Sequence, residues 1–280
     1  MRQAILTLTT DFGSEGLYVA AVKGVILGLA YHTQFVDVTH TISPQNILEG
    51  AFVLSGLIDV FPKGTVHLAV VDPGVGTDRR LIVALVADHW FVVPDNGLLS
   101  MVTRDRQPSG IWEIANPAFR RIPVSSTFHG RDILAPAAAH LLVGGEPAEL
   151  GPVRTKLVTL RNIQAVENET GFVGEVILRD SFGNLITNIE AKRLGEQPRE
   201  DWTIEVAGAQ IDGLGRTYAD EIAGTLVALA GSTGWIEISI VNGDAGRHLT
   251  AGPGTTVWMK KKSKETLPGE TLHRGQPISE

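Results

Sequence analysis

The chain has 280 residues, of which 43% are hydrophobic and 20% are charged, and its formal net charge is −7. This globular composition excludes a largely disordered protein, and the acidic balance argues against broad binding to nucleic acid or anionic membranes. The sequence holds no cysteine, which excludes disulfides, thiolate metal sites and a cysteine nucleophile, and which suits a reducing cytoplasm.

The N-terminal segment lacks the apolar stretch of a signal peptide, because it reaches Thr9-Thr10-Asp11 after only a few apolar positions. No run approaches the roughly 18 consecutive apolar residues of a membrane-spanning helix. We therefore expect a cytoplasmic protein without a membrane or nucleic-acid partner.

The first half of the chain alternates short apolar runs with helical patterns. This alternation is typical of an α/β domain with a mainly parallel sheet. The expected elements, in chain order, are a strand at 4–9, a helix at 17–29, a strand at 35–38, a helix at 47–60, a strand at 66–71, a hairpin of strands at 81–86 and 90–93, a helix beginning at 98–102 and a helix at 133–142. The near-continuous apolar run at 66–71 indicates a strand that is covered on both faces.

Helical patterns become scarce in the second half, and short β-type runs separated by Gly, Asn and Asp replace them. These runs lie at 173–178, 185–189, 202–206, 210–211, 226–230, 235–240 and 255–259. Their spacing predicts a smaller all-β, barrel-like domain. The expected organisation is an α/β domain at 1–163, a β-barrel domain at 168–262 and a loose tail at 263–280.

Two polar loops directly follow apolar strands, where open α/β sheets place ligands. In the first, Thr9 to Gly13, the Asp11 carboxylate is suited to accept hydrogen bonds from both hydroxyls of a vicinal diol. The alternative is that Asp11 caps the helix that begins near Leu17. In the second, Val70 to Arg80, the Pro-Gly and Gly-Thr pairs impose tight turns after Asp72. The alternative there is a turn with solvated charges.

Two further segments are dense in functional residue types. Ser126 to Asp132 gathers His129, an arginine and an aspartate just before a helix, although a structural histidine is as good an interpretation. Asp180 to Asn188 sets Phe182 beside carboxylate and amide groups, which suits stacking on a heterocycle, or else forms a β-hairpin turn. The segment from Ser232 to Glu237 is a weaker candidate.

Five motifs occur in order along roughly residues 4–258, and in this order they are highly specific. They are Thr-Thr-Asp-Phe-Gly at 9–13, Val-Asp-Pro-Gly-Val-Gly-Thr-x-Arg at 71–79, Pro-Asp-Asn-Gly at 94–97, Thr-Phe-His-Gly-Arg-Asp at 127–132 and Asp-x-Phe-Gly-Asn-x-x-Thr-Asn at 180–188. Together they resemble the S-adenosylmethionine hydroxide adenosyltransferases, hydrolases related to the bacterial fluorinase and chlorinase.

The resemblance implies an enzyme that converts S-adenosyl-L-methionine and water into adenosine and L-methionine, with attack at C5′. It implies a catalytic set of Asp72, Arg79 and His129, where Arg79 is preferred to Arg80 by its distance from Asp72. The substrate-binding residues that it implies are Asp11, Phe12, Asp180, Phe182 and Asn184, with Ser232 and Glu237 matched less securely because the spacing around them drifts.

The resemblance also implies a homotrimer with each site at a subunit interface, whereas the residues themselves leave an intramolecular cleft equally open. No cofactor and no resident metal are expected, since S-adenosyl-L-methionine is the substrate. A metal-dependent hydrolase stays open only if Asp11, Asp72, His129 and Asp132 converge.

Two other functions are alternatives. A halide-dependent 5′-halo-5′-deoxyadenosine synthase is disfavoured because Gly130 stands where fluorinases have a serine, and because Asp72 should repel an anion. A chlorinase has glycine there too. The other is a non-catalytic module that binds adenosine or S-adenosylmethionine, which would not need the polar set near C5′.

Overall fold

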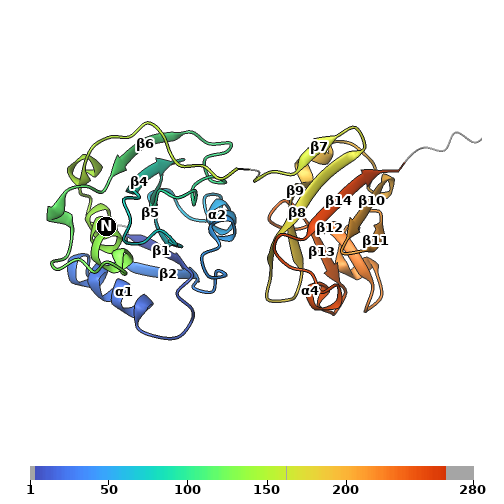
Figure 1. Cartoon of the computed structure of the whole chain (residues 1–280), viewed down its shortest axis with the longest axis horizontal. Helices are drawn as coiled ribbons and strands as arrows, with labels where there is room; N and C mark the ends of the chain where they lie inside the picture. The colour runs from blue at the N-terminus through green and yellow to red at the C-terminus, as the bar shows by residue number, and fades with distance from the viewer. Residues whose placement is uncertain (1–3, 162, 263–280) are drawn as a thin grey trace, which may run out of the picture. The chain divides into compact units, whose positions relative to one another are not determined.

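The computed structural model describes residues 4–161 and 163–262 (Figure 1). The chain divides into two compact units between Gln164 and Ala165, and each unit is built on one sheet. The expected tail at 263–280 lies outside the described residues.

The first unit contains six strands and three α-helices among its described residues. They are β1 (Ile5–Thr10), α1 (Tyr18–Leu29), β2 (Gln34–Thr39), α2 (Ile47–Ser55), β3 (Val66–Val70), β4 (Leu81–Val86), β5 (His89–Pro94), β6 (Pro108–Glu113) and α3 (Ala135–Leu142). The strand order is β2-β1-β3-β5-β4-β6. Neighbours from β2 to β5 pair parallel, whereas β4 is antiparallel to both β5 and β6. The sheet is therefore mixed, and the expected parallel character holds for part of it.

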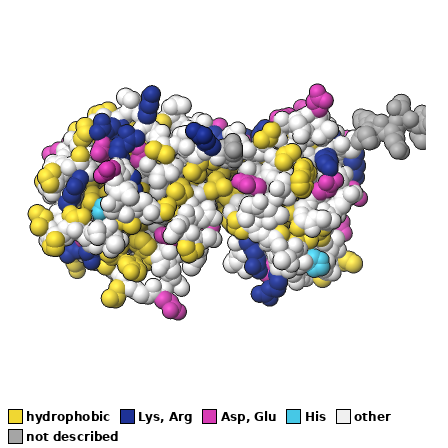
Figure 2. Space-filling view, viewed as in Figure 1, with side chains coloured by type: hydrophobic (Ala, Val, Ile, Leu, Met, Phe, Trp, Pro, Cys, Tyr) yellow, Lys and Arg dark blue, Asp and Glu magenta, His cyan; other side chains and the backbone are white. Residues whose placement is uncertain are grey.

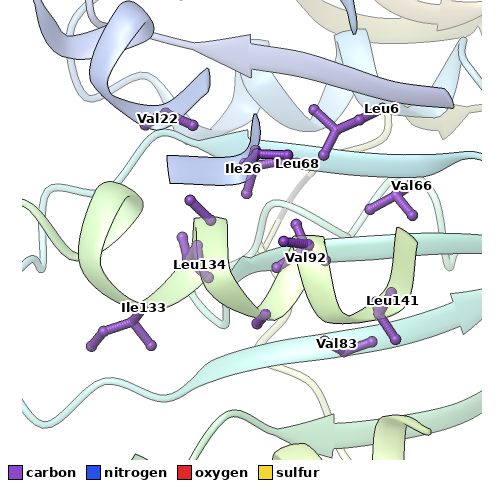
Figure 3. Packing of buried hydrophobic residues seen from close by; sticks show 14 of the residues in the cluster. Leu6, Val22, Ile26, Val66, Leu68, Val83, Val92, Ile133, Leu134 and Leu141 are labelled. Carbon is purple, nitrogen blue, oxygen red and sulfur yellow. The ribbon is translucent and has the colours of Figure 1, made fainter. Parts of the chain in front are cut away.

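Helices cover both faces of this sheet. Side chains of α1 and α3 such as Val22 and Leu141 belong to one cluster with Leu68 of β3 on one face (Figure 3). On the opposite face, Leu54 of α2 belongs to a cluster with Ala69 of β3. Because successive side chains of a strand point to opposite faces, β3 is buried at every position, and all of its residues except His67 are apolar.

Two sequence-based expectations for this unit were inaccurate, and one strand was not predicted. The expected helix at 98–102 is a run of turns, whose residues Leu98, Leu99 and Val102 are buried in the cluster with α2. A run of turns can bury these few apolar side chains, so their burial does not require the regular spacing of a helix. The second helix ends at Ser55, and turns complete the segment. Strand β6 was not predicted, because its first residues, Pro108-Ser-Gly, carry little β-type signal at the sheet edge.

The second unit is an antiparallel, barrel-like sheet. Its strands are β7 (Val166–Asn168), β8 (Gly171–Arg179), β9 (Leu185–Glu190), β10 (Trp202–Val206), β11 (Ala209–Asp212), β12 (Leu226–Ala230), β13 (Trp235–Ile240) and β14 (Thr256–Lys261), with the one-turn helix α4 (Ala245–His248). The order is β11-β10-β14-β8-β9-β13-β12, and β7 pairs with β8. A bridge from Gly215, just after β11, to Leu229 of β12 brings the two ends of the sheet together, so it nearly closes.

The faces shown in Figure 2 carry Lys and Arg in small groups, often beside Asp or Glu. Ion pairs of the first unit include Lys23–Asp37 and Arg106–Asp59. Across the described part of the chain, none of the helices has the length and apolar character needed to cross a membrane.

Candidate active site

The loops after β1 and β3 meet at one edge of the first sheet. These two strands are parallel neighbours in which Thr10 pairs with Val70, and the N–H of Asp11 donates to the carbonyl of Val70 at 3.4 Å. The carboxyl ends of parallel strands lie at the same sheet edge, so the chain after each strand enters the same region. The loops that carry Asp11 and Asp72 are therefore neighbours.

Asp72 forms a two-pronged ion pair with Arg79. Nε of Arg79 lies 2.5 Å from one carboxylate oxygen of Asp72, and Nη2 donates to the other oxygen. The side chain of Arg79 is only 9% exposed, and that of Asp72 is only 5% exposed. The loop glycines make this possible: Gly74 leaves room for the Arg79 side chain, and Gly76 has a φ of +82° and lies against the carbonyl of Ser126.

His129 completes this arrangement from the segment before α3. Both terminal nitrogens of Arg79, Nη1 and Nη2, lie 3.2 Å from Nδ1 of His129. A guanidinium can only donate, so Nδ1 of His129 is the acceptor and the neutral ring carries its proton on Nε2. Burial, and next the positive charge of Arg79, lower the pKa of His129 below its ordinary value of 6.5, against the opposing effect of Asp72. The neutral ring is thereby favoured.

A close backbone approach brings His129 to the loop of Asp72. Gly130 begins the π-helical turn η2 (Gly130–Leu134), which leads into α3. A Cβ at Gly130 would lie 3.3 Å from Val70 at the end of β3 and 3.5 Å from Phe12. Asp132 is fully buried, and its carboxylate accepts from Arg121, Arg131 and the N–H of Ser125. Asp132 thus secures the segment and does not join Asp72.

Asp11 does not cap the first helix. The residue at the N-terminal cap of α1 is Leu17, and no side chain bonds there. Instead, one carboxylate oxygen of Asp11 accepts from the N–H of Gln45 at 2.9 Å. Next to Asp11, the Phe12 ring packs with Phe128 and Tyr18 at centroid distances of 5.7 and 5.6 Å.

The two adjacent arginines have different partners. Arg79 contacts Asp72 and His129, whereas Arg80 donates to Asp95, with Nε 2.9 Å from Oδ2. Both residues directly precede β4, and each arginine reaches a different carboxylate.

In the second unit, Asp180 organises the turn between β8 and β9. One of its oxygens accepts from the N–H groups of Phe182 and Asn184 at 2.9 and 2.8 Å, and the other accepts from the Asn184 side chain at 2.9 Å. The segment is therefore the β-hairpin turn that the sequence allowed as the alternative, and it presents Phe182 with 78% of its surface exposed.

Phe182 and Asn184 line a pocket of about 550 Å³. Its other lining residues are Tyr218, Ile240, Asn242, Gly243 and Asp244. These other lining residues were not predicted from the sequence. The Asn-Gly-Asp run at 242–244 was a recognisable turn signal, whereas Tyr218 lies in a short polar segment without any pattern.

Glu237 contacts Tyr218, one of the lining residues of this pocket, whereas Ser232 is not among the lining residues. The buried Glu237 carboxylate accepts from the hydroxyl of Tyr218 and from Ser239 at 3.3 Å. Burial, together with Glu237, raises the pKa of Tyr218 to about 12, so its hydroxyl stays protonated as a donor. Ser232 is exposed on the turn between β12 and β13.

Among the described residues, no group of three His, Asp or Glu side chains is placed to hold a metal ion. The candidates do not converge: Asp72 and His129 both contact Arg79, while Asp132 is bound by its own arginines.

Comparison with known proteins relates both units to one family. The model of the SAM hydroxide adenosyltransferase N-terminal domain matches residues 6–151, and that of the C-terminal domain matches residues 174–258. The chain is 37% identical over 256 residues to the (R)-S-adenosyl-L-methionine hydrolase of Thermus thermophilus, covering 89% of this chain and 96% of the relative. A fluorinase of Nocardia brasiliensis is more distant, at 27% identity over 67% of this chain and 72% of that protein.

A solved structure supports the same relationship. The crystal structure of an uncharacterized conserved protein from Thermotoga maritima is similar at a TM-score of 0.85 and 33% identity, covering 92% of this chain and all of that one. Both family models and these identities lead to the same conclusion: the chain belongs to the SAM hydroxide adenosyltransferase family.

Proposed function

We propose that Asp72, Arg79 and His129 direct water or hydroxide onto C5′ of (R)-S-adenosyl-L-methionine, which gives adenosine and L-methionine. The chain is an enzyme, an S-adenosyl-L-methionine hydrolase. The observation that carries the mechanism is the continuous hydrogen-bonded set from Asp72 through Arg79 to His129, at the sheet edge where the loop of Asp11 also lies.

The reaction makes limited demands on the protein. The nucleophile's oxygen forms a bond to C5′, the C5′–S bond breaks, and its electron pair stays on sulfur as the neutral thioether of methionine. A sulfonium needs no acid to help it leave. The enzyme must hold one nucleophile in line with the breaking bond and exclude competing water.

Each member of the set has a distinct role in this proposal. With Nδ1 of His129 occupied by Arg79, the ring presents its Nε2–H as a donor that orients the oxygen of the nucleophile. Asp72 takes the proton that the water loses, because a carboxylate oxygen keeps acceptor capacity after it accepts one hydrogen bond. Arg79 holds both partners in place and balances the charge of Asp72.

The substrate-binding residues divide between the two units. We propose that Asp11 accepts from the ribose hydroxyls beside Phe12, and that the pocket with Phe182 and Asn184 takes the adenine or methionine end. Asp180 shapes its turn, and Glu237 positions Tyr218 by the hydrogen bond between them. Ser232 belongs to this proposal only by its match to the family pattern.

We further propose a homotrimer in which the first unit of one subunit and the second unit of its neighbour share each site. Cyclic symmetry closes such head-to-tail contacts. The large exposed surface of Phe182 on its own unit is consistent with a neighbour that covers it. The proposal includes no cofactor, no metal and no nucleic-acid or membrane partner. The absence of cysteine supports a cytoplasmic location.

Of two arguments against the halide-dependent alternative, the structure weakens one and leaves the other in place. Because Arg79 neutralises Asp72, repulsion of an anion by that carboxylate is weaker than its charge suggests. A halide, however, has no proton for Asp72 to accept, whereas water does. The higher identity to hydrolases than to fluorinases agrees with water.

Turnover in water labelled with a heavy isotope of oxygen, measured with and without chloride, tests the function. The purified chain and the (R) sulfonium substrate should yield adenosine that carries heavy oxygen at C5′, in equal amounts at either chloride level. A halogenated nucleoside as main product would overturn the hydrolase assignment, and substrate binding without any product would leave a binding module.

A further inference from the structure

The Pro-Asp-Asn-Gly motif at 94–97 has no role in the reaction described above, although it lies beside the residues that have one. It begins at the last residue of β5, the parallel neighbour of β3, so it stands at the same sheet edge as Asp72. The side chain of Asp95 is only 2% exposed. A buried carboxylate at this edge needs partners, and those partners define what the motif does.

Asn96 holds the end of β3 where the catalytic loop begins. Its side-chain Nδ2 donates to the carbonyl of Val71 at 2.9 Å, and its Oδ1 accepts from the N–H of Leu98 at 3.3 Å. The Val71 carbonyl belongs to the peptide group that leads into Asp72. This hydrogen bond therefore fixes the backbone from which the Asp72 side chain projects.

Asp95 holds the other end of the same loop. Oδ2 accepts from Nε and Nη2 of Arg80 at 2.9 and 2.5 Å, and the Asp95 N–H donates to the Arg80 carbonyl at 2.9 Å. Both the backbone and the side chain of Arg80 are thus bound, next to Arg79 in the chain. Oδ1 of Asp95 also accepts from the N–H of Val158 at 2.8 Å.

We infer that Asp95 and Asn96 are positioning residues for hydrolysis: they hold the two ends of the loop 72–80 in the register that lets Arg79 bridge Asp72 and His129. Asp95 also binds the guanidinium of Arg80, so that the Asp72 carboxylate is left with Arg79 as its arginine partner. This inference rests on the proposed function. A loop with both ends fixed presents the reacting groups without reorganisation.

Two variants test the inference from opposite ends of the loop. Asp95→Asn keeps the side-chain shape but removes its charge, and Asn96→Ala removes the bond to Val71. We expect each to lower kcat at least about tenfold, while KM and the Kd for adenosine change by no more than about twofold, because misplaced reacting groups act on the transition state. Glu113→Gln is the matched control, since it breaks a similar arginine–carboxylate pair elsewhere in the unit, with Arg154, and should keep kcat.

The pH–rate profile separates positioning from loss of folded enzyme. If Arg79 leaves Nδ1 of His129, the acid limb of kcat should move to higher pH in both variants, because the nearby positive charge no longer opposes protonation. A general loss of folded protein lowers the amplitude and leaves the limb in place.

The outcomes distinguish a failure of the proposed hydrolase function from a failure of the positioning role of Asp95 and Asn96. A wild-type chain that releases no adenosine fails the proposed function itself. An active wild type, together with folded variants that retain kcat and the acid limb, overturns the positioning role. If circular dichroism shows that Asp95→Asn does not fold, Asn96→Ala, which leaves the ion pair to Arg80 intact, decides alone.

Discussion

Arg79 lies with both terminal nitrogens 3.2 Å from Nδ1 of His129, which makes the histidine an acceptor on that side. The same guanidinium binds both oxygens of Asp72. One planar group thus sets the tautomer of the ring and the orientation of the carboxylate.

Replacing Arg79 by lysine should abolish this double contact, since an ammonium cannot present the planar fork of a guanidinium. We expect kcat to fall roughly 100-fold or more, while the Kd for adenosine stays within about threefold, because the lost contacts act mainly in the transition state. Steady-state kinetics and calorimetric titration with adenosine measure the two quantities. Arg154→Lys is the control and should keep kcat. A parallel loss of affinity and kcat would instead mean that Arg79 serves binding.

Activity should fall on the acid side as His129 is protonated. Protonated Nδ1 cannot accept from Arg79, and the ring would then carry a charge against the guanidinium. Since the pKa of His129 is lowered from 6.5, the limb should lie below that pH and activity should stay level above it. His129→Gln should be slow, and its pH profile should lack this limb. A wild-type profile that is flat through the acid range would contradict the role of a neutral ring.

Gly130→Ser should not convert the chain into a halogenating enzyme. The new Cβ would stand 3.3 Å from Val70, which is tighter than most such contacts, and 3.5 Å from Phe12, which is an ordinary contact, so His129 should shift slightly. We expect hydrolysis to slow and the product to remain adenosine in the presence of chloride or fluoride, as chromatography of the nucleosides would reveal. Accumulation of a halogenated nucleoside would count against this expectation.

Mixed assemblies of two inactive variants test the shared site. Asp72→Ala and Asn184→Ala chains, denatured and reassembled together, should regain part of the activity, because some interfaces then carry neither lesion. The matched control combines Asp72→Ala with His129→Ala: both lesions lie in the first unit, so every site keeps one and activity stays absent. If native mass spectrometry confirms mixed trimers and the first pair remains inactive, the site lies within one subunit.

A buried histidine pair should make folding sensitive to acid. His67 is fully buried, with Nδ1 2.8 Å from the Thr7 hydroxyl and Nε2 3.0 Å from Nδ1 of His89. Burial, and then His89, lower the pKa of His67 from 6.5 to about 3. The unfolded chain therefore binds its proton first, so this group's contribution is complete above pH 6.5 and is lost as the pH falls toward about 3.

Substituting His67 should expose this contribution. As the pH is lowered through this range, the free energy of unfolding should decrease less for His67→Gln than for the wild type. The two decreases should differ by a value of the order of a few kcal/mol. Urea titrations at several pH values measure it. His32→Gln, at an exposed histidine, should follow the wild type, and identical pH slopes for His67→Gln and wild type would refute the assignment.

Local patterns in the sequence were sufficient for most elements. The apolar runs at β1, β3 and β13 and the helical pattern of α1 predict their own structure, because alternation and helical period depend on neighbouring residues. The segment 98–102 shows the limit of this approach, since its apolar residues satisfy burial through turns.

The sequence by itself determined the residue types of the site and the order of the motifs, because strand ends, turn glycines and short polar loops are encoded locally. Only the tertiary structure decided the partners: Asp95 for Arg80, Asp132 as a support for its own segment, and Tyr218 beside Phe182. These choices depend on which strands become neighbours and which way each side chain points. Both are set by packing between segments far apart in the chain, which local patterns do not contain.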